Sequence, residues 1–401
     1  MADSVKSEPT SPSDRTDTVD PHPTDAPVDA GTADTAGPPQ FRYPRIVLAM
    51  SVLWTAFALF QTALSGHWWL MLAPDLIPPL AFALIPLLLA AAVPTGRMMR
   101  RSFTRWQAVG VLGVCAASLT LGLPWSGVNF YALDDHPAVP ASALRIMSWN
   151  TESWGKDTTP NRFYSYLRAQ DADVYLLQEV IRSDADDANP RAVPDADITR
   201  IYREFRGWNI VVRGELVTIS RFPIVSRPAV GPDRALSNQP NADWRTVFLA
   251  CKALRTDLLV GRSVLSVYNV HIPVQVDMRR SPFTPGFYRT LRDRNPARQE
   301  QYHGLLADLT ANRNPALIAG DFNTSPAMGD IEPLRERLND ASRVSDSFYP
   351  ISWNQLGSLR LWRLDWAFTT QGLKVDRYAL KPAPHGYSDH RAQFIRASLG
   401  S

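Results

Sequence analysis

Acidic, amide and imidazole side chains recur in short motifs along the last two thirds of the chain. The motifs are Ser148-Trp149-Asn150, Gln178-Glu179, Asn269-Val270-His271, Gly320-Asp321-Phe322-Asn323, Leu364-Asp365-Trp366 and Ser388-Asp389-His390. Cleavage of a phosphate ester or anhydride needs a cation that neutralises developing charge, a base for the attacking water, and donors that hold the phosphoryl oxygens. Because these residue types supply all three, the motifs indicate a metal-dependent site that cleaves phosphate bonds.

The candidate metal ligands are an acid and an amide. Mg²⁺ prefers carboxylate and amide oxygens and keeps several waters, so one or two protein carboxylates suffice to bind it. Glu179 is the best candidate, because it ends the apolar segment 174–177 and is held at the mouth of a site. Asn150 could supply an amide oxygen beside it. Taken alone, Glu179 would more often be a solvated acid at the end of a strand, and only the combination of motifs favours a ligand.

The candidate base is His390, because imidazole titrates near neutrality. An acid that accepts its other N–H would fix the tautomer and raise its basicity. Asp389 is adjacent and points to the opposite face of a strand, so Asp365 is predicted to be the acid that orients His390. His271 and Asn323 are predicted to donate hydrogen bonds to a phosphoryl oxygen.

The segments that carry the motifs are short, apolar and rich in β-branched or aromatic residues, which predicts strands. The expected strands are 145–149, 174–177, 214–219, 247–253, 264–270, 316–319 and 364–369. Helical periodicity occurs at 162–170 and 297–312, where Tyr302, Leu305, Leu306 and Leu309 form the expected buried stripe. This mixture predicts an α/β or α+β sandwich with catalytic side chains on loops at one edge.

Together with Ser220-Arg221-Phe222-Pro223, the ordered motifs resemble those of the endonuclease/exonuclease/phosphatase superfamily, the DNase I-like fold, over about residues 144–399. The resemblance implies a four-layer α/β (α+β) sandwich with a Mg²⁺ or Mn²⁺ site at one edge. It implies roles for eight residues: Asn150 and Glu179 as the metal-binding pair, Asp389 as a further metal-side carboxylate, His271 as a phosphate contact, Asp321 and Asn323 as the residues that orient water and phosphate, and Asp365 with His390 as an acid–histidine pair. The choice of general base between the histidine and Asp321 stays open.

Three apolar segments precede the motifs, at about 46–65, 70–93 and 106–129. At about 1.5 Å per residue, each is long enough to cross a hydrocarbon core of roughly 30 Å. They predict three transmembrane helices within residues 41–130, followed by a linker at 131–143 and a catalytic domain at 144–399. Several prolines and Asp75 interrupt the second segment, so a kinked or partly re-entrant span is the alternative there.

Charge is distributed unevenly around these segments, although the chain as a whole carries a net charge of only +3. Residues 1–40 hold eight acids, two bases and seven prolines, which predicts a disordered acidic tail. Arginines precede the first segment and fill the loop between the second and third, whereas the loop 66–69 has none. By the positive-inside rule, the tail is cytoplasmic and the catalytic domain is extracytoplasmic in a multi-pass protein of the cytoplasmic membrane. Because Cys251 is the only cysteine of that domain, no disulfide can form within it.

The substrate is less constrained than the chemistry. The short linker would hold the site near the outer leaflet, and six arginines from Arg279 to Arg298, interleaved with aromatic residues, could bind an anionic head group. An ordinary solvated insertion is the alternative for this segment. Arg298 and Trp353 are the candidate substrate-binding residues. The layout also resembles that of bacterial membrane proteins associated with teicoplanin resistance, which implies a lipid-linked pyrophosphate as substrate. The alternatives are an outward-facing nuclease, with nucleic acid on the same arginines, and a non-catalytic membrane sensor. No obligate protein partner is indicated.

Overall fold

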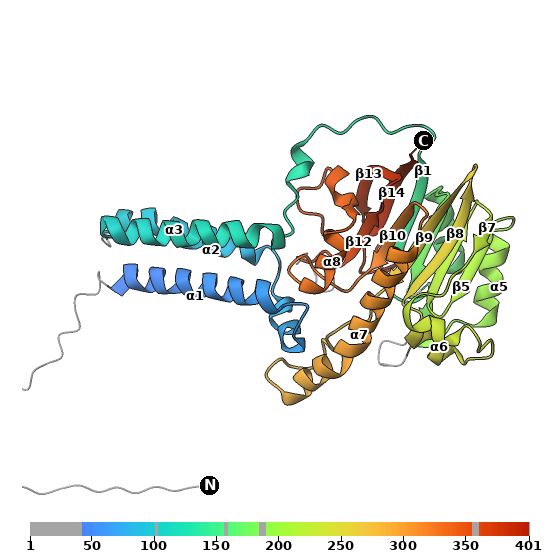
Figure 1. Ribbon diagram of the computed structural model, residues 1–401, viewed down its shortest axis with the longest axis horizontal. Helices are drawn as coiled ribbons and strands as arrows, with labels where there is room; N and C mark the ends of the chain where they lie inside the picture. Colours follow the sequence, from blue (N-terminus) through green and yellow to red (C-terminus); the bar gives the residue numbers. More distant parts are fainter. Residues whose placement is uncertain (1–41, 101–102, 156–158, 184–189, 355–360, 401) are drawn as a thin grey trace, which may run out of the picture.

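The computed structural model describes residues 42–100, 103–155, 159–183, 190–354 and 361–400. The predicted acidic tail at 1–40 lies outside the described residues. Within them, three long helices project from one side of a domain built around two β-sheets, as Figure 1 shows. The polypeptide passes from the helices to the first strand over the outside of this domain, through the predicted linker region (Figure 1).

The first sheet has six strands: β1 (Leu144–Asn150), β2 (Val174–Gln178), β5 (Asn209–Arg213), β6 (Leu216–Ser220), β13 (Leu373–Lys381) and β14 (Ala392–Leu399). Their order is β13-β14-β1-β2-β6-β5. The second sheet contains β7 (Ile224–Ser226), β8 (Ala253–Val260), β9 (Ser263–His271), β10 (Ala316–Asp321), β11 (Asn339–Asp340) and β12 (Asp365–Thr369), in the order β11-β12-β10-β9-β8-β7. A short hairpin of β3 (Ile181–Arg182) and β4 (Arg191–Ala192) stands apart. Each large sheet contains one parallel pair, β1 with β2 and β9 with β10.

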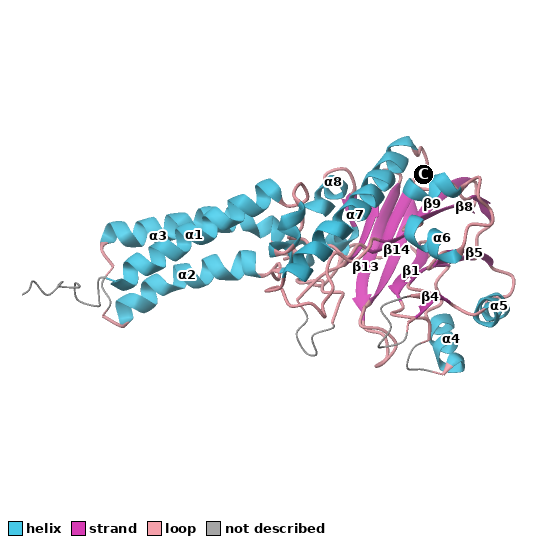
Figure 2. Cartoon of the chain, turned by 90° about the horizontal axis from the view of Figure 1, so that it is seen from below, coloured by secondary structure: helices cyan, strands magenta, loops and turns pink. Residues whose placement is uncertain are grey.

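The alternation of side chains along the strands produces four layers. In β2, Val174 and Leu176 join the core between the two sheets, whereas Tyr175 and Leu177 join the core beneath the helices. Helices α4 (Pro160–Ala169) and α5 (Asp195–Glu204) cover the first sheet, and α7 (Pro285–Ala311) and α8 (Glu332–Arg335) cover the second. Figure 2 shows the helices on the outside of the sheets. The predicted four-layer sandwich is confirmed.

Two sequence predictions of secondary structure need correction. The sequence predicts a strand over 247–253, but α6 (Trp244–Ala250) occupies most of this segment and β8 begins only at Ala253. The carboxylate of Asp243 caps α6 by accepting the backbone N–H of Thr246 at 3.0 Å, which satisfies a donor that the helix leaves free. Helix α7 begins at Pro285, well before the predicted start at 297, and Pro296 lies inside it.

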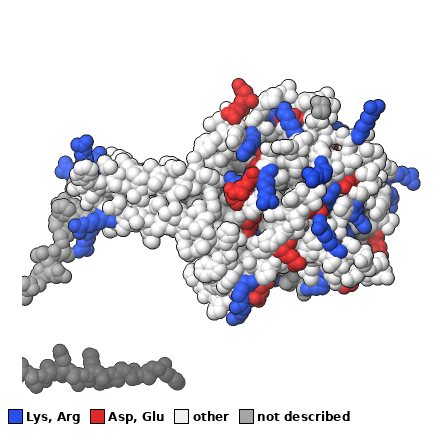
Figure 3. Space-filling view, viewed as in Figure 1, with Lys and Arg blue, Asp and Glu red and all other residues white. Residues whose placement is uncertain are grey.

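The three apolar helices are α1 (Arg42–Leu64), α2 (Ala81–Met98) and α3 (Arg105–Gly122). Each is long and apolar enough to cross a membrane, and most of each apolar window is not buried against the rest of the protein. In Figure 3, the surface of this bundle is free of charged side chains along most of its length on the face shown, with Lys and Arg at the end far from the sandwich. That distribution suits a hydrocarbon environment around the bundle.

The second helix begins later than the sequence predicted. Instead of a span over 70–93, the segment forms two short 3-10 helices, η2 (Trp69–Leu72) and η3 (Pro74–Leu76), before α2 starts at Ala81. Proline lacks a backbone N–H and restricts the residue before it, so Pro74, Pro78 and Pro79 prevent a continuous α-helix here. The candidate span in this part of the chain is therefore α2 over 81–98, and the segment 70–80 lies outside it.

Buried polar contacts attach the end of α1 to the sandwich domain. The carboxylate of Asp75 is 1% exposed and accepts hydrogen bonds from Gln61 Nε2 and Ser65 Oγ. In turn, Ser65 Oγ accepts the backbone N–H of Gly329 at 2.7 Å, and Gln61 Nε2 donates to the carbonyl of Ala327 at 3.3 Å. Asp75 therefore organises the contact between the helical bundle and the loop that follows β10.

We expect Gly329→Ala to destabilise the full-length protein by about 2 kcal/mol or more, because overpacking against backbone cannot relax easily. A Cβ at position 329 would lie 2.1 Å from the carbonyl oxygen of Ser65. Thermal unfolding in detergent micelles measures the effect. Gly113→Ala is the matched control, since nothing lies within 4 Å of its Cβ. Equal melting temperatures for the two variants would show that this approach of the two backbones contributes nothing.

Candidate active site

The polar motifs meet at one edge of the sandwich because several strands end or begin there. Asn150 ends β1, and His271 and Asp321 end the parallel strands β9 and β10. The register pairs Asp321 with His271 on one side and with Asp365, the first residue of antiparallel β12, on the other. His390 lies two residues before β14. The topology thus brings together residues that are far apart in sequence.

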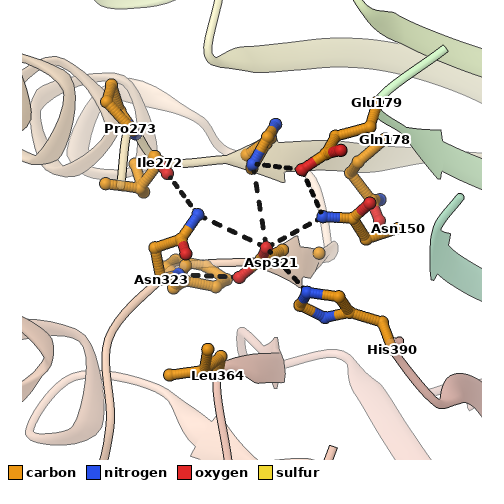
Figure 4. A network of polar contacts seen from close by, with 12 residues as sticks. Asn150, Gln178, Glu179, Ile272, Pro273, Asp321, Asn323, Leu364 and His390 are labelled. Atoms are coloured by element: carbon orange, nitrogen blue, oxygen red, sulfur yellow. Dashed lines mark hydrogen bonds and ion pairs between the residues drawn. The ribbon is translucent and has the colours of Figure 1, made fainter. Parts of the chain in front are cut away.

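Asp321 lies at the centre of the cluster, surrounded by Asn150, His390 and Asn323 in Figure 4. Its Oδ2 accepts a hydrogen bond from Asn150 Nδ2 at 3.0 Å, and lies 3.7 Å from His271 Nε2 and 3.6 Å from His390 Nε2. Its Oδ1 accepts the backbone N–H of Asn323 at 2.7 Å. One buried carboxylate therefore faces two imidazoles and an amide, an arrangement suited to hold a water and a phosphoryl oxygen side by side.

Two groups of side chains, which share Asp321, have ligand atoms within 4.8 Å of one another: Glu179 with His271 and Asp321, and Asp321 with Asp365 and His390. In the first group, Asn150 Nδ2 contacts the carboxylates of both Glu179 and Asp321, each at 3.0 Å. Burial raises the pKa of Glu179, although His271 opposes this shift. Glu179 and Asp321 both accept a hydrogen bond from the same amide group, in a buried environment where two negative charges repel. A cation between the two carboxylates would relieve this repulsion, so the donor set fits a hard divalent metal.

Asn150 does not present itself as the predicted metal ligand. Its Oδ1 accepts the backbone N–H of Glu152 at 2.9 Å, so its NH₂ group points toward Glu179 and Asp321. An amide NH₂ donates hydrogen bonds and has no lone pair for a cation. In this arrangement Asn150 holds the two carboxylates in place, and its predicted role as an oxygen ligand is not supported.

The predicted pairing of Asp365 with His390 is observed. Asp365 Oδ2 lies 2.8 Å from His390 Nδ1, and the backbone N–H of Asp365 donates to Ser352 Oγ at 2.9 Å. Burial lowers the pKa of His390, but the carboxylates of Asp365 and Asp321 outweigh it and raise this pKa well above its usual value. Asp365 therefore occupies Nδ1 and leaves Nε2 directed at the centre of the site.

A second acid–histidine pair, which the sequence analysis missed, holds His271. Glu215, 1% exposed between β5 and β6, places Oε1 at 3.1 Å from His271 Nδ1 and also contacts Lys252 Nζ. Burial lowers the pKa of His271, but Glu215 reverses the shift and raises the pKa to about 9. Burial raises the pKa of Glu215, but His271 and Lys252 lower it to about 2. The sequence feature that indicates this pair is the position of Glu215 inside an otherwise apolar segment. A buried acid there needs a partner of opposite charge.

We expect Glu215→Gln to lower kcat/KM by about 10- to 100-fold, the range for residues that orient a group at a metal site. Without this carboxylate the pKa of His271 falls from about 9 toward 6.5. The protonated form then disappears at lower pH, so the alkaline limb of the kcat/KM profile should move to lower pH. Glu300→Gln, on the exposed side of α7, is the control. An unchanged alkaline limb would exclude protonated His271 from the reaction.

Asp389 and Trp353 border the cluster. Trp353 Nε1 donates to Asp389 Oδ2 at 2.8 Å, while Asp389 Oδ1 lies 3.8 Å from His390 Nε2. Asp389 belongs to neither group of converging ligand atoms, so its role on the metal side stays a prediction. The half-buried Trp353 contacts Trp362 edge to face, with ring centroids 5.8 Å apart. Its predicted contact with substrate likewise stays a prediction, supported by its place beside Asp389.

The prediction that Arg298 contacts substrate is wrong. Its side chain is fully buried, where it donates to Thr324 Oγ1 at 2.9 Å, lies 3.2 Å from Asp330 Oδ2 and contacts the carbonyl of Pro273. A guanidinium in a buried ion pair cannot be reached by a substrate. Arg298 instead joins the loop that follows His271 to the loop that follows Asp321.

Other motif residues build the floor of the site. Gln178 Nε2 donates to Asn269 Oδ1 at 2.6 Å, and Asn269 Nδ2 donates to the carbonyls of Leu177 and Val217 at 3.0 Å each. These amides connect the two sheets beneath the cluster. Gly320 is required for the close approach of β10 to β9, because a Cβ there would lie 1.9 Å from the carbonyl oxygen of Val270.

The sandwich, the metal-binding donor set and the two acid–histidine pairs define a metal-dependent phosphoester hydrolase with a DNase I-like fold. The chain belongs to the endonuclease/exonuclease/phosphatase family, whose sequence model matches residues 147–390. That match covers all of the clustered site residues from Asn150 to His390.

Solved structures of proteins from three bacteria are similar to the chain. An endonuclease/exonuclease/phosphatase from Beutenbergia cavernae is 18% identical, with a TM-score of 0.42 over 65% of this chain and 72% of that one. A 3′ phosphatase from Neisseria bound to a product DNA hairpin is 16% identical, with a TM-score of 0.44 over 65% and 100%. A mannosyl-6-phosphatase from Bacteroides thetaiotaomicron is 14% identical, with a TM-score of 0.42 over 64% and 100%. No curated protein matched the chain.

Proposed function

We propose that this protein is a membrane-anchored phosphohydrolase that cleaves a phosphate ester or pyrophosphate of a lipid-linked substrate at the outer face of the cytoplasmic membrane. The proposal keeps the domain division predicted from the sequence: a cytoplasmic tail at 1–40, a membrane region within 41–130, a linker at 131–143 and a catalytic domain at 144–399. The arginines at the far end of the helical bundle support a cytoplasmic position for that end (Figure 3).

One observation carries the proposal: the closeness of the site to the end of the apolar helices. Gln61 and Ser65, at the end of α1, contact Ala327 and Gly329 in the loop after β10. Asn323, which binds Asp321, precedes Ala327 by only four residues in this loop. Since a chain spans at most about 3.6 Å per residue, the site lies within about 15 Å of that contact. Such a distance favours a phosphate in the head-group region of the membrane.

The residues that would hold the metal are Glu179 and Asp321, with His271 beside them. A divalent cation bound there supplies charge that stabilises a phosphoryl group as it becomes more negative. Asn150 fixes the two carboxylates through its NH₂ group, so their oxygens are positioned before substrate arrives. Because the carboxylate oxygens are already in place, they need not be rearranged during the reaction.

His271 and His390 would donate to phosphoryl oxygens, because neighbouring carboxylates raise the pKa of both rings and favour their protonated forms. Asp321 Oδ2 lies within 3.7 Å of both Nε2 atoms, which suits it to orient the attacking water and accept its proton. Asn323 donates from Nδ2 to the carbonyl of Ile272 at 2.9 Å, which keeps the loops after β9 and β10 together. This division of roles favours Asp321 over His390 as the base, among the options that the sequence left open.

Release of phosphate from a polyprenyl pyrophosphate by the purified full-length protein tests the proposal, with Mg²⁺ or Mn²⁺ and plasmid DNA in parallel. We expect metal-dependent phosphate release that is lost in His390→Ala. Cleavage of DNA without phosphate release would instead make the protein a tethered nuclease. Inactivity of the folded protein on both substrates would contradict the proposed substrate and favour the sensor alternative.

A further inference from the structure

We propose that the start of α7, together with the segment before it, forms a binding site for the phosphate head groups of anionic phospholipids. A pocket of about 590 Å³ lies there, with walls that include Trp69, Phe283, Tyr288, Arg289 and Arg292. We call it the α7 pocket. It lies apart from the cluster around Asp321, and none of its lining residues belongs to the candidate active site.

The α7 pocket is fixed at the membrane end of the catalytic domain. Trp69 begins η2, only five residues after the last residue of α1. Leu72 in η2 packs in one apolar cluster with Phe287 and Leu291 of α7. Figure 1 shows the start of α7 beside the turn that follows α1. Any membrane that surrounds α1 therefore has its surface next to this pocket.

Positive charge without nearby compensation makes the pocket suitable for phosphate. Between residues 277 and 294 the chain has five arginines and two aspartates. Asp277 pairs with Arg279 and Arg280, outside the pocket walls. Within the described residues, Arg289 forms no ion pair, and the nearest carboxylate of Arg292 is that of the neighbouring, largely exposed Asp293 at 3.5 Å. One guanidinium group can donate two hydrogen bonds to two oxygens of the same phosphate. Both arginines can therefore bind a phosphate head group.

Aromatic exposure in the same place indicates a bilayer rather than water. The Phe283 side chain is 94% exposed, and Tyr288 on the same wall is 36% exposed. Aromatic side chains concentrate at membrane interfaces, where their rings enter the boundary between head groups and acyl chains. A lipid surface would cover Phe283 while its phosphates meet Arg289 and Arg292. This combination fits an anionic phospholipid better than a free phosphate ion, which would leave the phenyl ring in water.

The lipid contact would fix the tilt of the catalytic domain on the leaflet. The helical bundle alone attaches one side of the domain, and a second contact at α7 would prevent it from rotating away from the surface. This inference shares with the proposed function the insertion of α1 to α3 into a membrane. It does not depend on which phosphate bond is cleaved.

A label at position 283 tests the predicted depth. Both native cysteines, Cys115 and Cys251, are buried, so Phe283→Cys can be labelled selectively with a fluorophore in the full-length protein. In liposomes of phosphatidylcholine and phosphatidylglycerol with brominated acyl chains, we expect strong quenching of this label. The same label at Arg262→Cys, in the turn between β8 and β9, should remain unquenched. Equal, weak quenching at both positions would overturn the proposal.

A charge reversal tests the head-group contact. In nanodiscs of mixed lipids, the double variant Arg289→Glu/Arg292→Glu should bind phosphatidylglycerol more weakly than the wild-type protein does. The expected loss in the amount of bound phosphatidylglycerol is about fivefold for each arginine replaced. Arg262→Glu is the matched control and should retain the wild-type amount. An unchanged amount of bound phosphatidylglycerol in the double variant would contradict the proposal. So would a double variant that no longer binds an oligonucleotide but still binds phosphatidylglycerol like the wild type. If the wild-type protein binds phosphatidylglycerol selectively but hydrolyses no lipid pyrophosphate, only the proposed substrate is refuted.

Discussion

Replacement of His390 by alanine is expected to lower kcat by about 10²- to 10⁴-fold, the usual contribution of a positioned acid or base. The physical reason is the geometry around its ring. Nδ1 is held by Asp365 at 2.8 Å, and Nε2 lies 3.6 Å from Asp321 Oδ2. Alanine removes the proposed donor for the phosphoryl oxygen and leaves the buried carboxylate of Asp365 without its partner. Initial rates with a soluble phosphoester or a lipid pyrophosphate measure the loss.

The matched control for this variant is His303→Ala, because His303 is exposed on α7 and belongs to none of the site motifs. Its activity should equal that of the wild type. Near-ultraviolet circular dichroism of both variants distinguishes lost chemistry from lost folding. Full activity of a folded His390→Ala protein would remove the histidine from the reaction, and the acid–histidine pair would then be structural.

Replacement of Glu179 by alanine is expected to raise the metal concentration for half-maximal activity by more than about 100-fold, since residues one step removed from a metal already contribute 10- to 100-fold. Glu179 and Asp321 are the two carboxylates held by the amide of Asn150, each at 3.0 Å. Loss of one leaves a single carboxylate, a poor set for a hard cation. Titration of activity with Mg²⁺ and with Mn²⁺ gives the shift.

Chelation provides the companion measurement for Glu179→Ala. Wild-type activity should vanish with EDTA and return fully on addition of Mg²⁺ or Mn²⁺, whereas the variant should recover only at high metal concentration. Glu300→Gln, with its side chain on the exposed surface of α7, should titrate like the wild type. A variant with the wild-type metal dependence would place the cation elsewhere, and the group formed by Asp321, Asp365 and His390 would be the next candidate.

The sequence predicted the fold class and most of the site because the informative residues sit at the ends of recognisable strands. Asn150, His271 and Asp321 each end a strand, and β1, β9 and β10 are buried along nearly their whole length, as their short apolar segments predict. The prediction of a strand over 247–253 is wrong. A short apolar segment has no clear periodicity, and the N-terminal cap at Asp243 stabilises a helix there.

Residue types and their order determined by themselves that phosphate bonds are cleaved with a metal, since acids, amides and imidazoles in this series suit that chemistry. Only the tertiary structure decided which atom of each side chain faces the site. The NH₂ group of Asn150 faces the carboxylates, Glu215 supports His271, and Arg298 is buried in an ion pair. These outcomes depend on contacts between residues far apart in the chain, such as that between Asn150 and Asp321. Local sequence sets strand and helix preference, whereas the direction of a polar side chain is set by the partner that the fold places opposite it.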